Sequence, residues 1–321
     1  MPQTKAQSVS KRRSYRFFLG VDGGGTKTNV ALINAAGEFV SEGFSGPSNP
    51  LRVGVETAVA NIAKAVDAAC DAGHISRGDI AAATLGLAGV RRTDIRERVR
   101  ESFLARYRIR KTQVTTDADI ALFGTTLGKP GAVVIAGTGS ICLGVNDAGE
   151  KAIAGGWGPI AGDEGGGRGI AEQALHSIAK ASDGRGPKTA LSEQAAEYFR
   201  ASNVENLIGA IYAPQMDNSR IAGFARLVVE TALEGDKIAV EIITDAGREL
   251  GIAAVAVLKR LGLEKRKVPI GCVGGVFKAG DLLTAPMTAI IGKTAPKAYL
   301  IEPLMPPSHA AAQMAMMTNG E

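Results

Sequence analysis

The chain has 321 residues, of which 45% are hydrophobic and 21% are charged. These values are typical of globular proteins and exclude extensive disorder, and a length of about 150 residues per domain predicts two domains. The net charge is +5, and residues 1–16 hold five basic residues and no acidic one: Lys5, Lys11, Arg12, Arg13 and Arg16. Without them the body is neutral, so we expect no nucleic-acid binding and a disordered basic tail at 1–16, with a basic docking arm as the alternative.

The apolar segments are too short for export or membrane insertion. The stretch after Arg16 ends at Asp22, and the most apolar run elsewhere covers only residues 250–258. Three widely spaced cysteines, Cys70, Cys142 and Cys272, form no CxxC pair. We therefore expect a cytoplasmic protein with reduced thiols, no disulfide framework and no membrane association.

The first part of the chain predicts a strand meander followed by alternating helices and strands. Strands are expected at 17–21, 29–33 and 38–44. Apolar residues then recur at helical spacing from Val55 to Cys70, and Gly73 follows as a stop signal. A strand at 81–87, a charged helix at 94–104 and a short strand at 114–116 complete this part, and they place Asp117 at the end of a strand.

The same order of strand, glycine-rich corner and strand begins again near residue 132. Strands are expected at 132–136, 141–146, 151–154, 268–273 and 298–301, and helices at 238–261 and 310–317. The repeat predicts an α/β protein with two similar lobes, which meet near 127–131. We assign residues 17–128 to the first lobe and residues 129–306 to the second.

The most informative motif is Asp22-Gly23-Gly24-Gly25-Thr26-Lys27-Thr28. Glycines directly after a strand let backbone N–H groups approach an anion, and Thr26 and Thr28 can add hydroxyl donors, whereas Lys27 can simply point to solvent. Asp22 at the strand end can hold Mg²⁺ through water, because Mg²⁺ dehydrates reluctantly. A glycine-rich hairpin with an acidic residue at its mouth is the structural alternative.

Two further glycine sites repeat this chemistry. Gly137-Thr138-Gly139-Ser140 also joins two predicted strands, and it lacks the third glycine and the helix of a dinucleotide-binding fingerprint. The first corner likewise fails as a P-loop, because Thr26 stands where that motif requires lysine. We predict that the two corners hold one polyphosphate. Gly274-Gly275 could let a base or ribose lie against the main chain, or could form an ordinary turn.

Together these residues resemble the sugar kinase, heat-shock chaperone and actin superfamily of ATPases, and within it the N-acetylglucosamine kinase and BadF/BadG/BcrA/BcrD ATPase family. The resemblance covers nearly all of residues 17–316. Beyond the two corners it rests on Gly46-Pro47-Ser48-Asn49-Pro50, Thr116-Asp117-Ala118, Gly155-Gly156-Trp157-Gly158 and Gly162-Asp163-Glu164-Gly165. It implies two ribonuclease-H-like lobes with ATP in a cleft between them, and a last helix (307–321) that crosses back to the first lobe.

The resemblance also implies a role for each motif. The two corners match the phosphate loops, Gly274-Gly275 matches the adenosine site, and Asp117 matches the catalytic carboxylate, although a helix N-cap is its structural alternative. The expected sugar contacts are Asn49, Gly156, Trp157, Asp163 and Glu164, with core packing as the alternative for Trp157. These roles predict a Mg²⁺- and ATP-dependent kinase of N-acetylglucosamine at its 6-hydroxyl, and relatives suggest a homodimer.

Other interpretations remain open at this point. Ile141 and Gly166-Gly167-Arg168-Gly169 depart from the pattern of relatives, which leaves glucosamine or another hexose as an alternative substrate. An ATPase that activates a partner enzyme would need cysteines for an iron–sulfur cluster between subunits, and the three cysteines here are dispersed. A sugar-sensing repressor would need a helix-turn-helix module, for which residues 1–16 are too short. A non-catalytic actin-like or chaperone-like module would leave the sugar-side motifs without a purpose.

Overall fold

The computed structural model describes residues 17–214 and 216–320, and its contacts divide the chain into two compact units. Unit 1 combines two stretches of the chain, the residues up to Ile120 and those from Pro306 onward. Unit 2 is the continuous stretch Ala121–Met305. The expected tail at 1–16 lies outside the described residues. The boundary between the units falls within the helix Asp117–Thr126, whereas the sequence predicted a boundary at 127–131, directly after this helix.

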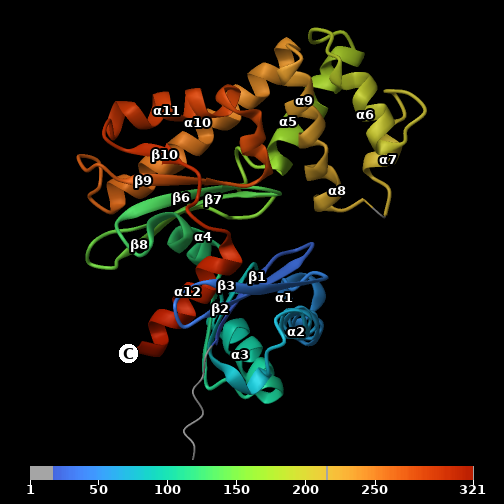
Figure 1. The fold of residues 1–321 in the computed structure, drawn as a ribbon. Coiled ribbons are helices and arrows are strands. Elements are labelled where there is room, and N and C mark those ends of the chain that lie inside the picture. The colour runs from blue at the N-terminus through green and yellow to red at the C-terminus, as the bar shows by residue number, and fades with distance from the viewer. Residues whose placement is uncertain (1–16, 215, 321) are drawn as a thin grey trace, which may run out of the picture. The chain divides into compact units, whose positions relative to one another are not determined.

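Unit 1 is built on a five-stranded sheet with the order β3-β2-β1-β4-β5 (Figure 1). Its strands are β1 (Phe17–Gly23), β2 (Thr28–Asn34), β3 (Phe39–Ser45), β4 (Ile80–Leu87) and β5 (Lys111–Thr116). The first three form an antiparallel meander, and β4 and β5 continue the sheet parallel to β1. Since β1, β3, β4 and β5 run in the same direction, the segments that follow them lie at one edge of the sheet.

The helices of unit 1 cover both faces of this sheet. They are α1 (Pro50–Val53), α2 (Val55–Ala72), the 3₁₀ helix η1 (Arg77–Asp79), α3 (Thr93–Tyr107), the start of α4 (Asp117–Thr126) and α12 (Pro307–Gly320). Side chains alternate along β1, so Leu19 and Val21 join the core shared with α2 and α3, while Phe18 packs with α12 on the opposite face. The last helix of the chain therefore completes the core of the first unit.

Unit 2 repeats the sheet topology with unrelated residues. Its sheet has the order β10-β9-β6-β7-β8, with β6 (Gly131–Ala136), β7 (Ser140–Val145), β8 (Lys151–Gly155), β9 (Pro269–Val273) and β10 (Tyr299–Ile301). The strands β6, β7 and β8 form an antiparallel meander, and β9 and β10 run parallel to β6. The predicted repeat of strand, glycine corner and strand is therefore confirmed as a repeat of topology.

The helices of unit 2 form one large hydrophobic core with this sheet. They are α5 (Gly167–Ser182), α6 (Leu191–Phe199), α7 (Leu207–Ile211), α8 (Asn218–Gly223), α9 (Ala225–Leu233), α10 (Lys237–Arg260), the 3₁₀ helix η2 (Gly275–Ala279) and α11 (Asp281–Thr294) (Figure 1). The long helix α10 packs against β7 and β8 and is in contact with α11. Among the described residues, none of the helices combines the length and the apolar character needed to cross a bilayer.

The contact between β1 and α12 predicts a steric requirement at Gly20. A Cβ atom there would lie 2.0 Å from the carbonyl oxygen of Ser308 and 2.2 Å from the nitrogen of Ala312. We expect Gly20→Ala to lower the free energy of unfolding by about 1–3 kcal/mol, because α12 must move away from the strand. Chemical denaturation measures this change.

The control variant for Gly20→Ala is Gly292→Ala. Gly292 lies in α11, and a Cβ atom there would have no heavy atom within 4 Å. Alanine is the better helix former, so this variant should gain up to about 1 kcal/mol of stability. Equal stabilities of the two variants would contradict the close packing of α12 on β1.

Candidate active site

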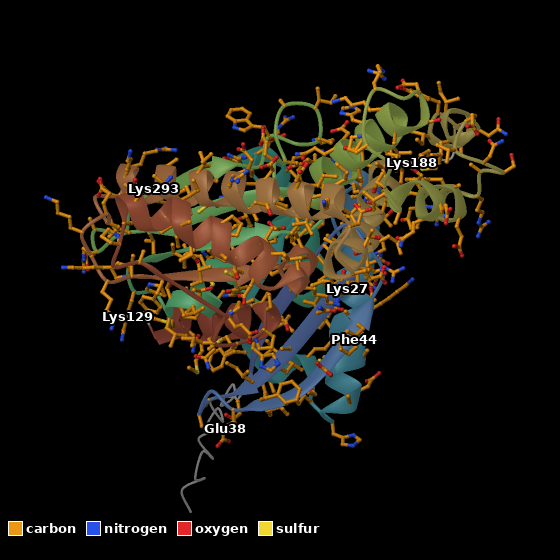
Figure 2. All side chains as sticks on the ribbon, turned by 90° about the horizontal axis from the view of Figure 1, so that it is seen from above. Lys27, Glu38, Phe44, Lys129, Lys188 and Lys293 are labelled. Atoms are coloured by element: carbon orange, nitrogen blue, oxygen red, sulfur yellow. The ribbon has the colours of Figure 1, made fainter. Side chains whose placement is uncertain are left out.

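The predicted site residues of unit 1 lie at the edge of the sheet where β1, β3 and β5 end. In the first corner, between β1 and β2, the nitrogen of Gly24 donates to the carbonyl oxygen of Lys27 at 2.9 Å. The Lys27 side chain is exposed, and it lies at the opposite end of β2 from Glu38 (Figure 2). A Cβ atom on Gly23 would lie 2.2 Å from the Ser48 hydroxyl, so only glycine fits between β1 and the segment after β3.

Two carboxylates of unit 1 have raised pKa values at this edge. Asp22 is the penultimate residue of β1, and burial raises its pKa to about 6, with further contributions from the negative charge of Asp117 and, in the opposite direction, from Lys27. Burial also raises the pKa of Asp117. A divalent cation beside Asp22 would relieve this electrostatic cost, so these residues fit a Mg²⁺ ion.

No protein cage for a metal accompanies Asp22. Within residues 17–214 and 216–320, no group of three or more His, Cys, Asp or Glu side chains could hold an ion. Mg²⁺ commonly binds through one or two carboxylates and completes its shell with water and substrate phosphates. A single carboxylate such as Asp22 would therefore leave most of the shell of such an ion to other ligands.

The helix cap at α4 is made by Thr116 and not by Asp117. The nitrogen of Asp119 donates to the Thr116 hydroxyl at 3.1 Å, and the nitrogen of Thr116 donates back to the Asp119 carboxylate at 3.1 Å. The hydroxyls of Thr115 and Thr116 also bond this carboxylate, each at 2.6 Å. This reciprocal pattern is a capping box, so Thr116 and not Asp117 is the N-cap of α4. The Asp117 carboxylate accepts a hydrogen bond from the nitrogen of Ala118 at 2.9 Å.

The segment after β3 brings Asn49 to the same edge of the unit 1 sheet. Asn49 is the N-cap of α1, and its side-chain oxygen accepts from the nitrogen of Leu51 at 3.0 Å. A Cβ atom on Gly89, which follows β4, would lie 2.2 Å from this oxygen. Gly89 also has a φ of +82°, so both the backbone conformation and the close approach to Asn49 require glycine at this position.

In unit 2 the second corner and the motif that contains Asp163 form one hydrogen-bonded structure. The nitrogen of Ser140 donates to the Asp163 carboxylate at 3.2 Å, and the Ser140 hydroxyl donates to the carbonyl oxygen of Glu164 at 2.6 Å. A Cβ atom on Gly139 would lie 2.4 Å from the same carboxylate. Asp163 is 8% exposed and has a φ of +67°, a conformation that aspartate tolerates better than most residues.

The start of α5 completes this arrangement in unit 2. The nitrogen of Gly167 donates to the carbonyl oxygen of Gly137 at 2.8 Å, and the nitrogen of Arg168 donates to the carbonyl oxygen of Thr138 at 2.8 Å. The first turn of a helix thus runs alongside the second corner. Asp163, predicted as a sugar contact, is therefore joined to the corner that was predicted to hold phosphate.

The other predicted residues of unit 2 follow β8 and β9. Gly156 directly follows β8, and its nitrogen donates to the carbonyl oxygen of Ser140 at 2.9 Å. Trp157 is 75% exposed, so it is not a core residue. Glu164 is exposed and lines a cavity of about 260 Å³ together with Ser140 and Ile141. Gly274 follows β9 with a φ of +116°, and a Cβ atom there would lie 2.2 Å from the carbonyl oxygen of Ala136.

The structure thus gathers the predicted residues into one group in each unit. Unit 1 brings the first corner, Asn49 and Asp117 to one edge of its sheet, and unit 2 does the same for the second corner, its glycine-rich loops and Asp163. Sequence reasoning missed two supporting features. The Thr-x-x-Asp spacing at 116–119 signals the capping box, whereas nothing local to Asn61 shows that its amide donates to the carbonyl oxygen of Pro47 at 2.7 Å.

Comparison with known proteins agrees with this organisation over almost the whole chain. The model of the BadF/BadG/BcrA/BcrD ATPase family matches residues 19–317. An N-acetylmuramic acid/N-acetylglucosamine kinase from Clostridium acetobutylicum is 31% identical, and the match covers 89% of this chain and 94% of that protein. An N-acetyl-D-glucosamine kinase from Dictyostelium discoideum is also 31% identical, with 94% of this chain and 98% of that protein covered.

A solved structure shows the same fold. A candidate N-acetylglucosamine kinase from Chromobacterium violaceum superposes with a TM-score of 0.77 at 24% identity, over 94% of this chain and 99% of that one. The predicted fold class, two lobes of the actin-like ATPase type, is therefore confirmed.

The raised pKa of Asp22 predicts that this residue destabilises the free protein. Folding favours the protonated carboxyl, so ionisation costs stability above pH 6, and the cost disappears below about pH 4, where both the folded and unfolded states are protonated. In the absence of divalent cations, Asp22→Asn should raise the free energy of unfolding at pH 8 by about 1–3 kcal/mol, since the pKa shifts from 3.8 to about 6. Denaturation curves at pH 8 and pH 4 measure this difference.

The control for Asp22→Asn is Asp94→Asn. Asp94 is exposed, and hydrogen bonds from Arg92 lower its pKa. Its neutralisation removes a favourable interaction, so the variant should not gain stability at pH 8. A stabilisation of both variants would show that the loss of any aspartate, and not the burial of Asp22, causes the effect.

Proposed function

Because this chain belongs to the BadF/BadG/BcrA/BcrD ATPase family, we propose that it is an ATP-dependent sugar kinase that transfers the γ-phosphoryl group of ATP to the 6-hydroxyl of N-acetylglucosamine. Relatives with 31% identity over most of their length are kinases of N-acetylglucosamine, which supports an amino sugar as the substrate. The observation that carries the proposal is Asp117, a carboxylate with a raised pKa that directly follows β5 and lies close enough to Asp22 to raise the pKa of that residue, while Thr116 serves as the N-cap of α4.

Asp117 acts in this proposal as the general base. It accepts the proton of the sugar hydroxyl while the hydroxyl oxygen attacks the phosphorus atom, and the bond to the leaving ADP oxygen breaks. The raised pKa makes its carboxylate a stronger base than an exposed aspartate. Asp22 would hold Mg²⁺ through water, and the cation would supply charge neutralisation at the β- and γ-phosphates.

The glycine corners bind the phosphates through their main chain. In the second corner, the Cβ atom of an alanine at Gly137 would have no protein heavy atom within 4 Å, in contrast to Gly139. We assign this open side of Gly137 to the phosphate chain, and Gly274-Gly275 to the adenosine. Asn49, Gly156, Trp157, Asp163 and Glu164 contact the sugar, and the exposed indole of Trp157 covers an apolar face of the ring.

An ATPase that activates a partner enzyme is less well supported. Such proteins need cysteine thiolates that can reach an iron–sulfur cluster shared with a second subunit. Cys70 and Cys142 are buried in the cores of unit 1 and unit 2. Burial raises the pKa of both thiols, Cys70 to about 11, which disfavours the thiolate.

The decisive experiment measures sugar-dependent ADP release with Mg²⁺ across a panel. The panel contains N-acetylglucosamine, N-acetylmuramic acid, glucosamine and glucose, and the product is analysed for the position of the phosphate. We expect the highest kcat/KM for N-acetylglucosamine and phosphate at the 6-position. ATP hydrolysis that is independent of every sugar would overturn the proposal.

Asp117→Asn tests the general base. The substitution preserves the shape of the side chain and removes its proton acceptor, so kcat should fall by roughly 10²–10⁴-fold. ATP binding should persist, because the phosphate contacts come from other residues, and calorimetry with a non-hydrolysable ATP analogue measures it. Turnover close to that of the wild type would remove Asp117 from this role.

Gly137→Ala and Gly139→Ala test the phosphate contact. Alanine at Gly137 meets no protein atom, so thermal stability should be retained while the KM for ATP rises about tenfold or more, because phosphate can no longer approach the main chain. Alanine at Gly139 would collide with the Asp163 carboxylate and should cost about 1–3 kcal/mol of stability. An unchanged KM for ATP in Gly137→Ala would place the nucleotide elsewhere.

A further inference from the structure

The Thr28 hydroxyl is enclosed within unit 1 and does not face the open side of the first corner. Thr28 is the first residue of β2, and both Thr28 and Ser48 are completely buried. The Thr28 hydroxyl oxygen lies 2.7 Å from the carbonyl oxygen of Gly46 and 2.7 Å from the Ser48 hydroxyl oxygen. Three groups of one loop and one strand therefore form a closed hydrogen-bonded cluster.

Proton counting shows how this cluster is satisfied. A carbonyl oxygen only accepts, and a hydroxyl has one proton, so Thr28 donates to Gly46 and Ser48 donates to Thr28. Both hydroxyl protons are then used inside the protein. Neither side chain retains a donor for a phosphate oxygen, although the sequence predicts Thr28 as such a donor.

The main chain of the same loop, residues 46–49, is attached on two sides. The nitrogens of Ser48 and Asn49 both donate to the carbonyl oxygen of Gly24 in the first corner, at 3.0 and 3.1 Å. On the other side, the side chain of Asn61 from α2 donates to the carbonyl oxygen of Pro47 at 2.7 Å. The loop that presents Asn49 is thus bonded directly to the corner assigned to phosphate.

This attachment leaves little room for the loop to move. A Cβ atom on Gly23 would lie 2.2 Å from the Ser48 hydroxyl, which shows how closely β1 and the loop approach each other. Loss of the Thr28 hydroxyl would leave the carbonyl oxygen of Gly46 and the hydroxyl of Ser48 without their hydrogen-bond partner, and an unpaired buried group costs more than the bond itself contributes. The loop would then shift, and the position of Asn49 would shift with it.

We infer that Thr28 and Ser48 are positioning residues that hold Asn49, and through it the sugar, in register with the first corner. The inference rests on the proposed function, which assigns Asn49 to the sugar and the first corner to phosphate. It gives Thr28 a role in sugar affinity and separates it from Thr26, the exposed threonine of the same corner.

Thr28→Val tests the role of the hydroxyl with little change of shape. We expect the KM for the sugar to rise about tenfold or more, because an unsatisfied buried acceptor displaces the loop, while the KM for ATP changes less than about threefold. Ser48→Ala removes the second hydroxyl of the cluster but leaves Thr28 bonded to Gly46, so it should raise the KM for the sugar less than Thr28→Val does. Thr28→Ser keeps the hydroxyl and should restore the KM for the sugar to within a few-fold of wild type.

Thr26→Val provides the contrast within the same corner. Its hydroxyl is exposed, so its loss should raise the KM for ATP more than the KM for the sugar. Melting temperatures of all variants are measured in parallel, and Thr28→Ser and Ser48→Ala keep the test valid if Thr28→Val fails to fold.

Failure of this inference can be distinguished from failure of the proposed function. An active wild type in which Thr28→Val raises the KM for ATP and leaves the KM for the sugar unchanged would overturn this inference alone, because Thr28 would then serve the phosphate. Equal increases in both constants, without rescue by Thr28→Ser, would reduce Thr28 to a structural residue and would also overturn it. A wild type without sugar-dependent ADP release would overturn the proposed function and this inference together.

Discussion

At the strand ends a side chain from a neighbouring loop lies so close to the main chain of each corner that only glycine fits, and the rest of each unit is arranged around this constraint. In unit 1 the contact joins Gly23 to Ser48, and in unit 2 it joins Gly139 to the Asp163 carboxylate. Both contacts place a corner between two antiparallel strands directly against a loop that carries polar side chains. The geometry of each glycine corner therefore depends on the loop beside it in the same unit.

The two units solve the same packing problem with different side chains. Unit 1 secures its corner with hydroxyls and an amide, namely Thr28, Ser48 and Asn61. Unit 2 uses a carboxylate that accepts from the Ser140 nitrogen and a helix start that bonds to two corner carbonyls. The two units therefore share a topology, while unlike contacts hold their corners.

Much of this fold could be predicted from the sequence, because buried strands form short apolar runs and the glycines mark the corners between them. The short strand at 114–116 that delivers Asp117 was also predicted and is confirmed, although it begins earlier, at Lys111. Side-chain contacts between distant segments could not be predicted. Thr28 looks like a phosphate donor in the sequence, and its burial depends on Gly46 and Ser48, which lie 18 and 20 residues further along the chain. The exposure of Trp157 was equally undecided, since glycines surround it on a loop without periodicity.

The return of α12 to unit 1 has a consequence for the order in which the protein folds during synthesis. Unit 2 is one continuous stretch, Ala121–Met305, so the ribosome delivers all of it before α12 has emerged. Until then Phe18, Ile33 and Ala82 form an uncovered apolar face on the unit 1 sheet, because their partners Ala312 and Ala315 have not been made. The apolar face of the nascent first unit therefore stays exposed until α12 has been made. At this stage a chaperone would have the most exposed apolar surface to protect.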